Sequence, residues 1–387
     1  MKRNILNKIL IYIGCLIPAV LTSSCIEDFN ADLGEADTNI IVVEGNILSD
    51  TLCVFHLSKS AGINEDVYPA IIGINNAKVS IVGTDGSSYT SSAGTKEGAY
   101  YIETKKLASD AKYSLVIEWD GATFTSEPSV PIDAPEIESM SVKQPRPDQQ
   151  IDIMVTDAAG NSDKTNYCRW TYDDAWEVYT KYRPAFEYDP GVQKVVPIKV
   201  DKSHGWGHGQ YRDIIIANSS KLQNNQVKDF RICTFDNFDL RFQTLYCINV
   251  KQYAMSRGQY EYELARQELS DQLGGMFAPQ PSEMFSNIKS SDKKHRAIGY
   301  VGVCGKVSSF RFWVYRYDIE YNPILFRNIQ ITEDEEVLAK SNDEKYKGGY
   351  RVADDHEPMF QQWSWVNVKG VDATSWGCDL TKPSYWP

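Results

Sequence analysis

A series of short strand patterns separated by turn residues constrains the fold of this 387-residue chain more than any other feature. Within residues 39–133, seven short runs are rich in β-branched and aromatic residues or alternate apolar with polar ones. Asp120 and Gly121 suit a tight hairpin turn, because both residue types tolerate positive φ. Strands of this length and spacing pack as two sheets face to face. The pattern therefore predicts that residues 39–133 form a β-sandwich domain.

The rest of the chain, residues 134–387, also favours β-structure. Pro131 and Pro135 mark the boundary near residue 133, because proline interrupts sheet ladders. Further strand patterns occur at residues 151–157, 167–172, 176–179, 212–217, 245–250, 297–303 and 309–314. Only residues 260–269 favour a helix, with Ser256 as its cap and a glycine pair at residues 274–275 as its stop. The predicted fold is therefore mainly β, with a larger β-rich second domain that contains one helix.

The N-terminal residues predict where the chain works. Lys2, Arg3 and Lys8 accompany an apolar run at residues 9–21, which is shorter than the ~20 residues of a membrane-spanning helix. Residues 1–24 are therefore predicted to be a secretory signal peptide. The small residues before Cys25 are similar to a lipobox, which implies that Cys25 is acylated and that residues 25–38 form a lipidated tether. Two or more acyl chains anchor a protein stably to a bilayer. The alternative is that the chain is cleaved near Cys25 and that this cysteine stays free, without lipid.

The net charge of the chain limits the classes of partner that it is expected to bind. Without Lys2, Arg3 and Lys8 the formal net charge changes from −12 to −15. Nucleic acids and anionic lipid surfaces attract basic patches, so we predict no nucleic-acid partner.

Six cysteines lie beyond the signal peptide and the tether: Cys53, Cys168, Cys233, Cys247, Cys304 and Cys378. None has the short spacing of a Cys-x-x-Cys metal site. We expect at most one or two disulfides, with the other thiols buried in the core, and the sequence does not decide which cysteines pair.

Aromatic residues crowd two stretches, and these are the candidate ligand- or partner-binding regions. Residues 183–212 are predicted to be an irregular loop, and residues 340–376 form the second stretch. The candidate binding residues are Trp176, Tyr179, Tyr188, Trp206, Tyr211, Trp363 and Trp365. Aromatic rings exposed on loops suit stacking on sugars or packing against a protein partner, whereas rings in strands usually pack in the core. The sequence leaves both interpretations open.

No motif for catalysis, a cofactor or a metal stands out. The chain lacks Gly-x-Ser-x-Gly, His-Glu-x-x-His and a phosphate-binding glycine loop. His204 and His208 have a metal-like spacing, but the glycines between them exclude a stable helix, and we expect a flexible aromatic loop there. The acidic runs do not match the oxygen spacing of a calcium loop. We therefore predict no catalytic residue, no cofactor and no metal, and keep a hydrolase with paired carboxylates as a minor alternative.

Several segments, taken in their order along the chain, resemble one family. They are residues 42–45, 76–79, 98–100, 113–115, 273–288 and 378–386. Together they resemble the Bacteroidota lipoproteins grouped as domain-of-unknown-function family 4249, over nearly the whole mature chain. The N-terminal strands also resemble Ig-like, transthyretin-like or carboxypeptidase regulatory-like sandwiches. The sequence departs from the family near its end, where relatives often carry a Cys-x-x-Cys pair and Cys378 stands alone.

The resemblance implies a non-enzymatic partner of a TonB-dependent outer-membrane receptor that captures a ligand or gates uptake of a nutrient. Acidic residues directly after Cys25 resemble a surface-export signal, which implies an outer-membrane lipoprotein that faces the cell surface. Cys25 would hold it to the outer-membrane lipid through its acyl chains. A stand-alone carbohydrate- or protein-binding adhesin is the alternative.

Overall fold

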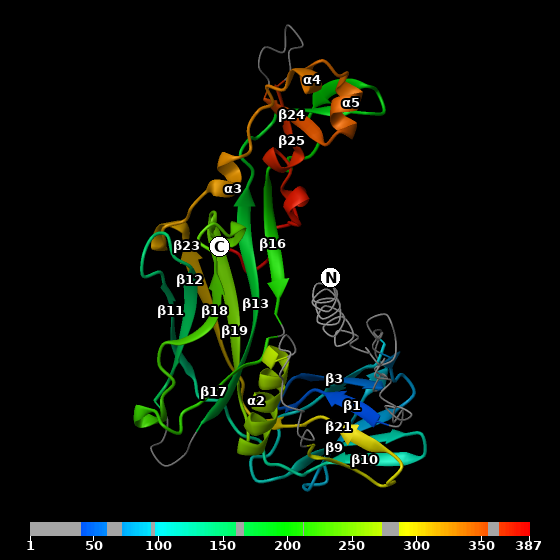
Figure 1. Ribbon diagram of the computed structural model, residues 1–387. Coiled ribbons are helices and arrows are strands. Elements are labelled where there is room, and N and C mark those ends of the chain that lie inside the picture. Colours follow the sequence, from blue (N-terminus) through cyan, green and yellow to red (C-terminus); the bar gives the residue numbers. More distant parts are fainter. Residues whose placement is uncertain are drawn as a thin grey trace, which may run out of the picture. The chain divides into compact units, whose positions relative to one another are not determined.

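The computed structural model describes residues 40–59, 72–93, 97–159, 166–211, 213–272, 286–354 and 364–387. All of them belong to one unit of the chain. The fold is mainly β, as predicted. In Figure 1 the colours of the elements follow their order along the chain. Among the described helices, none has the length and apolar character needed to cross a membrane. Cys25, the signal peptide and the predicted tether lie outside the described residues.

The N-terminal β-sandwich consists of two sheets. Its first sheet has the order β21-β1-β3-β8-β7, with β4 paired to β3, and its second has the order β20-β10-β9-β5-β6. The strands of the first sheet are β1 (Ile40–Glu44), β3 (Leu52–Lys59), β4 (Ile72–Gly73), β7 (Ser92–Ala93), β8 (Ala99–Glu103) and β21 (Arg296–Ile298). Those of the second sheet are β5 (Lys78–Gly83), β6 (Ser88–Thr90), β9 (Tyr113–Trp119), β10 (Ala122–Ser126) and β20 (Ile288–Ser290). Alternate residues of each strand point inward, so Phe55, Ile81 and Phe124 meet in one core.

Two strands of this sandwich come from far along the sequence. β21 pairs in parallel with β1, and β20 pairs antiparallel with β10. A short parallel pair, β2 (Ile47–Leu48) with β22 (Val303–Cys304), adds a third connection. The side chain of Asn287 is buried and exchanges hydrogen bonds with the backbone of Val301, 2.9 Å each way. Residues 286–304 therefore belong to the sandwich, although the predicted boundary near residue 133 places them in the second domain.

The larger sheet of the second region has the order β16-β13-β19-β23, with β17 also paired to β13. Its strands are β13 (Tyr167–Tyr179), β16 (His204–Gln210), β17 (Ile215–Asn218), β19 (Leu245–Ala254) and β23 (Ser308–Tyr315). A three-stranded sheet, β11 (Ile137–Lys143), β12 (Ile151–Asp157) and β18 (Phe230–Phe235), packs against one face of it around Trp170 and Tyr246. The predicted strands at residues 167–172 and 176–179 are one continuous strand, because Asp173 and Asp174 keep the ladder with β19.

Residues 183–212 are not an irregular loop, and this prediction was wrong. They form the hairpin β14 (Phe186–Asp189) and β15 (Lys194–Pro197), followed by β16. The glycines that argued against regular structure make the pairing of β16 possible. Gly205, Gly207 and Gly209 lie opposite Val178, Trp176 and Asp174 of β13, and an added Cβ at Gly207 would overlap the Trp176 indole. Glycine in a strand often marks such a close approach.

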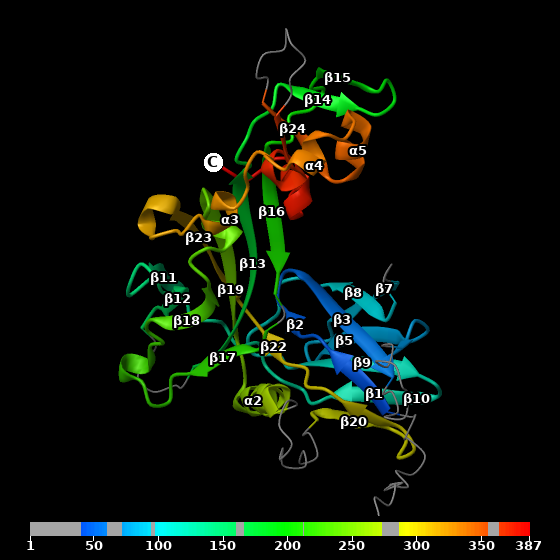
Figure 2. The ribbon, with the colours of Figure 1, turned by 45° about the horizontal axis from the view of Figure 1, so that its top comes forward.

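A smaller cluster forms beyond the end of the large sheet, and we call it the apical cluster. The hairpin β14–β15 packs there against α5 (Asn342–Lys347) and β24 (Tyr350–Asp354), as Figure 2 shows. β24 pairs in turn with β25 (Ser364–Asn367). The core of the apical cluster is Tyr188, Val352 and Trp365. A capping box between Ser341 and Glu344 starts α5.

The helices α3 (Ile324–Arg327), α4 (Glu335–Leu338) and α5 are additional to the one helix that the sequence predicted. The described part also contains the single-turn helices η1 (Gln223–Asn225), η2 (Leu240–Phe242), η3 (Arg316–Asp318), η5 (Val368–Gly370) and η6 (Ala373–Trp376).

The predicted helix is α2 (Arg257–Gln272), and it contacts both the sandwich and the large sheet. The Ser256 hydroxyl accepts a hydrogen bond from the Gln259 backbone N–H at 3.2 Å, which confirms the predicted cap. The Gln259 amide donates to Asn46 of the sandwich at 2.9 Å. On the other side of the helix, buried Glu263 accepts a hydrogen bond from Arg169 of β13 at 3.0 Å. Polar contacts rather than an apolar stripe therefore position α2.

Candidate functional site

The structure brings four of the predicted binding residues together on and beside strands β13 and β16. Trp176 and Tyr179 lie on β13, Trp206 lies on β16, and Tyr211 follows β16 directly. Tyr188 and Trp365 lie in the apical cluster, 4% and 1% exposed. Trp363 lies outside the described residues.

Trp206 packs in the core as well. It is 7% exposed and contacts Leu245 and Trp386, which comes from the C-terminal segment. Trp206 and Asp379 exchange backbone hydrogen bonds of 2.8 and 2.7 Å, so the C-terminal segment runs along β16. Burial of Tyr188, Trp206 and Trp365 leaves these rings no open face for a ligand.

Trp176 and Tyr211 surround a buried ion pair. The Asp174 side chain is fully buried, and its Oδ2 accepts hydrogen bonds from Arg241 Nε and Tyr246 OH, each at 3.1 Å. The Arg241 guanidinium lies 4.6 Å from the Trp176 ring centre and also donates to Tyr211 OH. Burial raises the pKa of Asp174, and Arg241 opposes that shift. These contacts join β13, β19 and η2, and sequence reasoning missed them because Arg241 and Tyr246 lie far from Asp174 in the chain.

Among the candidate residues that the structure describes, Tyr179 is the most exposed, with 45% of its surface accessible. Its ring stacks on His204 with centres 4.0 Å apart and planes 11° from parallel. Glu177 Oε1 lies 2.8 Å from His204 Nε2, which fixes the imidazole below the tyrosine. The Gln243 side chain accepts a hydrogen bond from the Tyr179 backbone N–H and donates one to the Tyr179 backbone C=O. Tyr179 and His204 therefore form a rigid aromatic platform.

The six described cysteines carry free thiols. Burial raises the pKa of Cys304 and Cys378 to about 11, and that of Cys233 and Cys247 to about 12. These thiols stay protonated at neutral pH, whereas a nucleophilic or metal-binding cysteine needs the thiolate form. In the described ranges no group of three or more His, Cys, Asp or Glu residues is placed to hold a metal ion.

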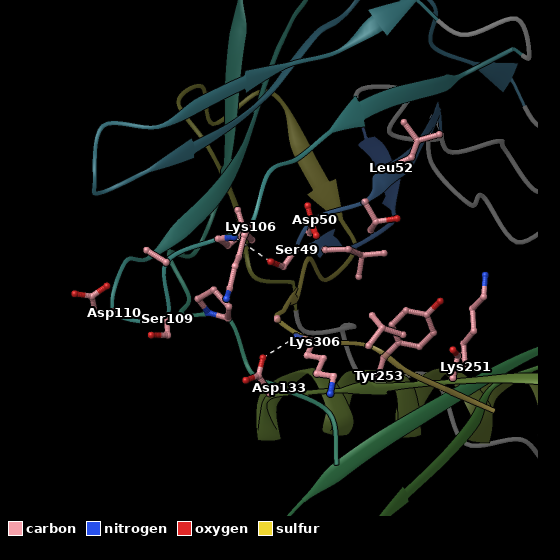
Figure 3. Close-up of a pocket in the computed structure, with 18 of the residues that line it drawn as sticks. Ser49, Asp50, Leu52, Lys106, Ser109, Asp110, Asp133, Lys251, Tyr253 and Lys306 are labelled. Atoms are coloured by element: carbon pink, nitrogen blue, oxygen red, sulfur yellow. Dashed lines mark hydrogen bonds between the residues drawn. The ribbon is translucent and has the colours of Figure 1, made fainter. Parts of the chain in front are cut away.

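A polar cleft of about 1080 Å³ opens between loops of the sandwich and one end of the large sheet. Figure 3 shows the side chains that line it. The sandwich contributes loop residues that include Asp50, Lys106 and Asp110, while β19 contributes Lys251 and Tyr253. The segments at residues 131–133 and 305–309 complete the second wall.

Hydrogen bonds hold both walls of the cleft in place. The Ser49 hydroxyl accepts from the Leu107 N–H at 2.9 Å, and Asp85 Oδ2 accepts from Tyr113 OH at 2.9 Å. On the other wall, Asp133 Oδ1 accepts from the Lys306 N–H at 2.6 Å. The cleft is therefore preformed, as small-molecule sites usually are. Sequence reasoning missed it, because its residues come from separate segments with no local motif.

Asp157 is a buried carboxylate outside the cleft, and it supports a prediction about stability. It is fully buried, its Oδ1 accepts from the Val227 N–H at 2.6 Å, and its Oδ2 has no hydrogen-bond partner. Burial raises the pKa of Asp157 to about 6 from an ordinary 3.8. Because the folded state binds this proton more tightly than the unfolded state, the group favours folding below about pH 4. That contribution is lost as the pH rises through about 6.

We therefore expect Asp157→Asn to raise the free energy of unfolding at pH 7.5 by about 1–2 kcal/mol and to leave it nearly unchanged at about pH 4. Urea denaturation across that range measures both values. Asp148→Asn, at an exposed position, is the matched control. A loss of stability at pH 7.5 in Asp157→Asn would show that the ionised carboxylate stabilises the fold.

The packed β-sheets define a mainly β protein with a β-sandwich, and a polar cleft opens beside that sandwich. The chain belongs to the family described as domain of unknown function DUF4249, whose model matches residues 26–309. No curated protein matches the sequence. Among solved structures, a DUF4785 family protein from Legionella pneumophila is similar at 12% identity and a TM-score of 0.16. That match covers 55% of this chain and about half, 52%, of the Legionella protein.

Proposed function

We propose that this chain is a non-enzymatic outer-membrane surface lipoprotein that works beside a TonB-dependent transporter in nutrient uptake. In this role it captures a ligand for the transporter or gates its entrance. Acylated Cys25 holds the protein to the membrane lipid. The chain belongs to the DUF4249 family. The partnership with a transporter is what the resemblance of its sequence to the lipoproteins of that family implies.

The observation that carries the capture role is the preformed cleft. Its volume of about 1080 Å³ lies at the upper end of ligand sites, and its walls are held by their own hydrogen bonds.

The length of the segment before the first strand fits a tethered protein. β1 begins at Ile40, so 14 residues separate it from Cys25. A segment of that length spans at most ~50 Å when fully extended. The folded part could thus reach over the mouth of a neighbouring barrel while the lipid stays in the membrane.

An affinity pull-down of the lipidated protein from outer membranes in mild detergent tests the proposal. Mass spectrometry should find a TonB-dependent barrel in near-equal amount. Cys25→Ala, which removes the acylation site, should lose the barrel because the protein leaves the membrane. Recovery of the wild-type protein alone would contradict the partnership.

One observation favours a second candidate function, a stand-alone adhesin for carbohydrate or protein. The platform of Tyr179 on His204 offers an open aromatic face with the Glu177 carboxylate beside it. Aromatic faces of this kind stack on sugar rings. Binding of the purified protein to glycan arrays, together with the absence of a barrel in the pull-down, would favour this function.

A further inference from the structure

The two walls of the cleft carry opposite charge. On the sandwich wall, Asp50, Asp85 and Asp110 outnumber Lys106. On the facing wall, Lys251 and Lys306 outnumber Asp133. A ligand that fits this arrangement carries a positive group and a negative group that are separated in space.

Some of these charged side chains already interact with neighbouring residues. Hydrogen bonds from Ser87 hold the pKa of Asp85 below its ordinary value, and Lys306 pairs with Glu136. By contrast, Asp50, Asp110 and Lys251 have no ion pair or side-chain hydrogen bond with any described residue. These three exposed groups are therefore available to a ligand.

Within the described part of the chain, no ion pair joins the two walls, although acids and lysines face one another there. Hydrogen bonds within each wall fix the loops that carry these charges. A dipolar ligand could bridge them and satisfy both.

The size and polarity of the cleft limit the chemical class of its ligand further. A cleft of about 1080 Å³ exceeds what one amino acid fills. The hydroxyls of Ser109 and Ser309 line it and can both donate and accept, which matches the alternating groups of a peptide backbone. Among the described residues that line the cleft, Tyr253 is the single aromatic one, so a sugar would find few rings on which to stack.

We propose that the cleft binds short peptides as zwitterions, with the free amino end toward Asp50 and Asp110 and the free carboxylate toward Lys251. This inference deepens the proposed capture role by naming its ligand class. The binding step itself needs no transporter, so the two proposals fail separately.

Isothermal titration calorimetry on the full-length lipoprotein in detergent tests the inference, with tetra-alanine as the probe. We expect tetra-alanine with free ends to bind, and its N-acetylated and C-amidated forms to bind at least about tenfold more weakly. Lys251→Glu and Asp50→Lys should each weaken binding by about tenfold or more. Lys221→Glu, an exposed lysine outside the cleft, should leave the affinity unchanged and controls for net charge.

Each contrary result overturns one part of the inference. No binding of free tetra-alanine at millimolar concentration removes peptides as the ligand class. Equal binding of the blocked peptide removes the zwitterion requirement. Unchanged binding in both cleft variants places the site elsewhere. Peptide binding without a barrel in the pull-down keeps the inference and rejects the transporter partnership.

Discussion

Replacing Arg241 by methionine is expected to lower the free energy of unfolding by about 3–5 kcal/mol. The reason is that the Asp174 side chain has no exposed surface, and its ion pair with Arg241 would be lost. One oxygen of Asp174 already lacks a hydrogen-bond partner among the described residues, so loss of the guanidinium leaves the buried carboxylate still less compensated. Methionine keeps much of the contact with Trp176 while removing the charge.

Urea denaturation followed by tryptophan fluorescence measures this loss. The double variant Asp174→Asn with Arg241→Met should recover about half of it or more, because the uncompensated charge is gone and Tyr246 keeps an acceptor. Arg183→Met, which breaks an ion pair whose arginine is 81% exposed, should cost less than about 0.5 kcal/mol. Equal losses for Arg183→Met and Arg241→Met would mean that burial of the pair does not matter.

The single variant Arg241→Met should also acquire a pH dependence. Burial raises the pKa of Asp174, and removal of Arg241 takes away the main opposing influence. The folded state would then favour the protonated carboxyl, so the loss of stability should be smaller at about pH 5 than at about pH 8. A loss that is the same at both values would show that packing, not charge, causes the destabilisation.

Gly207→Ala is expected to cost about 2–3 kcal/mol, although it adds a single methyl group. That methyl group would overlap the Trp176 indole, which crosses over Gly207 from the neighbouring strand. Neither partner can move easily, because Trp176 also packs on Arg241 and β16 is held on both sides by backbone hydrogen bonds.

A double-mutant cycle tests this interpretation. Trp176→Leu alone should cost about 2–3 kcal/mol, and its combination with Gly207→Ala should cost at least about 1 kcal/mol less than the sum. Gly191→Ala, in the β14–β15 turn, is the control, because an added Cβ there meets only Asp189 Oδ1 at 3.2 Å. Simple additivity of Gly207→Ala and Trp176→Leu would refute the overlap.

The sequence predicted the elements whose signals are local. β12 was predicted at residues 151–157, where the structure places it, because its inward residues alternate with outward ones. The cap at Ser256 was found because a capping residue acts within a few positions of itself. Asp120 and Gly121 both have positive φ, as their hairpin required.

The elements that the sequence missed depend on distant partners. β16 was not predicted, because its glycines are explained by residues far from them in the sequence. Gly207 and Gly209 lie against Trp176 and Asp174 of β13, and Gly205 lies against residues 373–379. The cleft was missed for a similar reason, since Asp50 and Lys251 meet only after the sandwich and the large sheet have formed. Periodicity describes a strand and its two faces, but it does not identify the strand beside it.

The late strands of the sandwich have a consequence for folding during synthesis. Ile40 pairs with Arg296, and Phe124 pairs with Ser290. The last two strands of the first domain, β20 and β21, are therefore synthesised long after its other strands. At ~5–20 residues per second, the interval between residues 126 and 298 lasts roughly ten to thirty seconds. During that time the emerging chain has two sheet edges without their final strands. This topology delays closure of the first domain until most of the chain has been made.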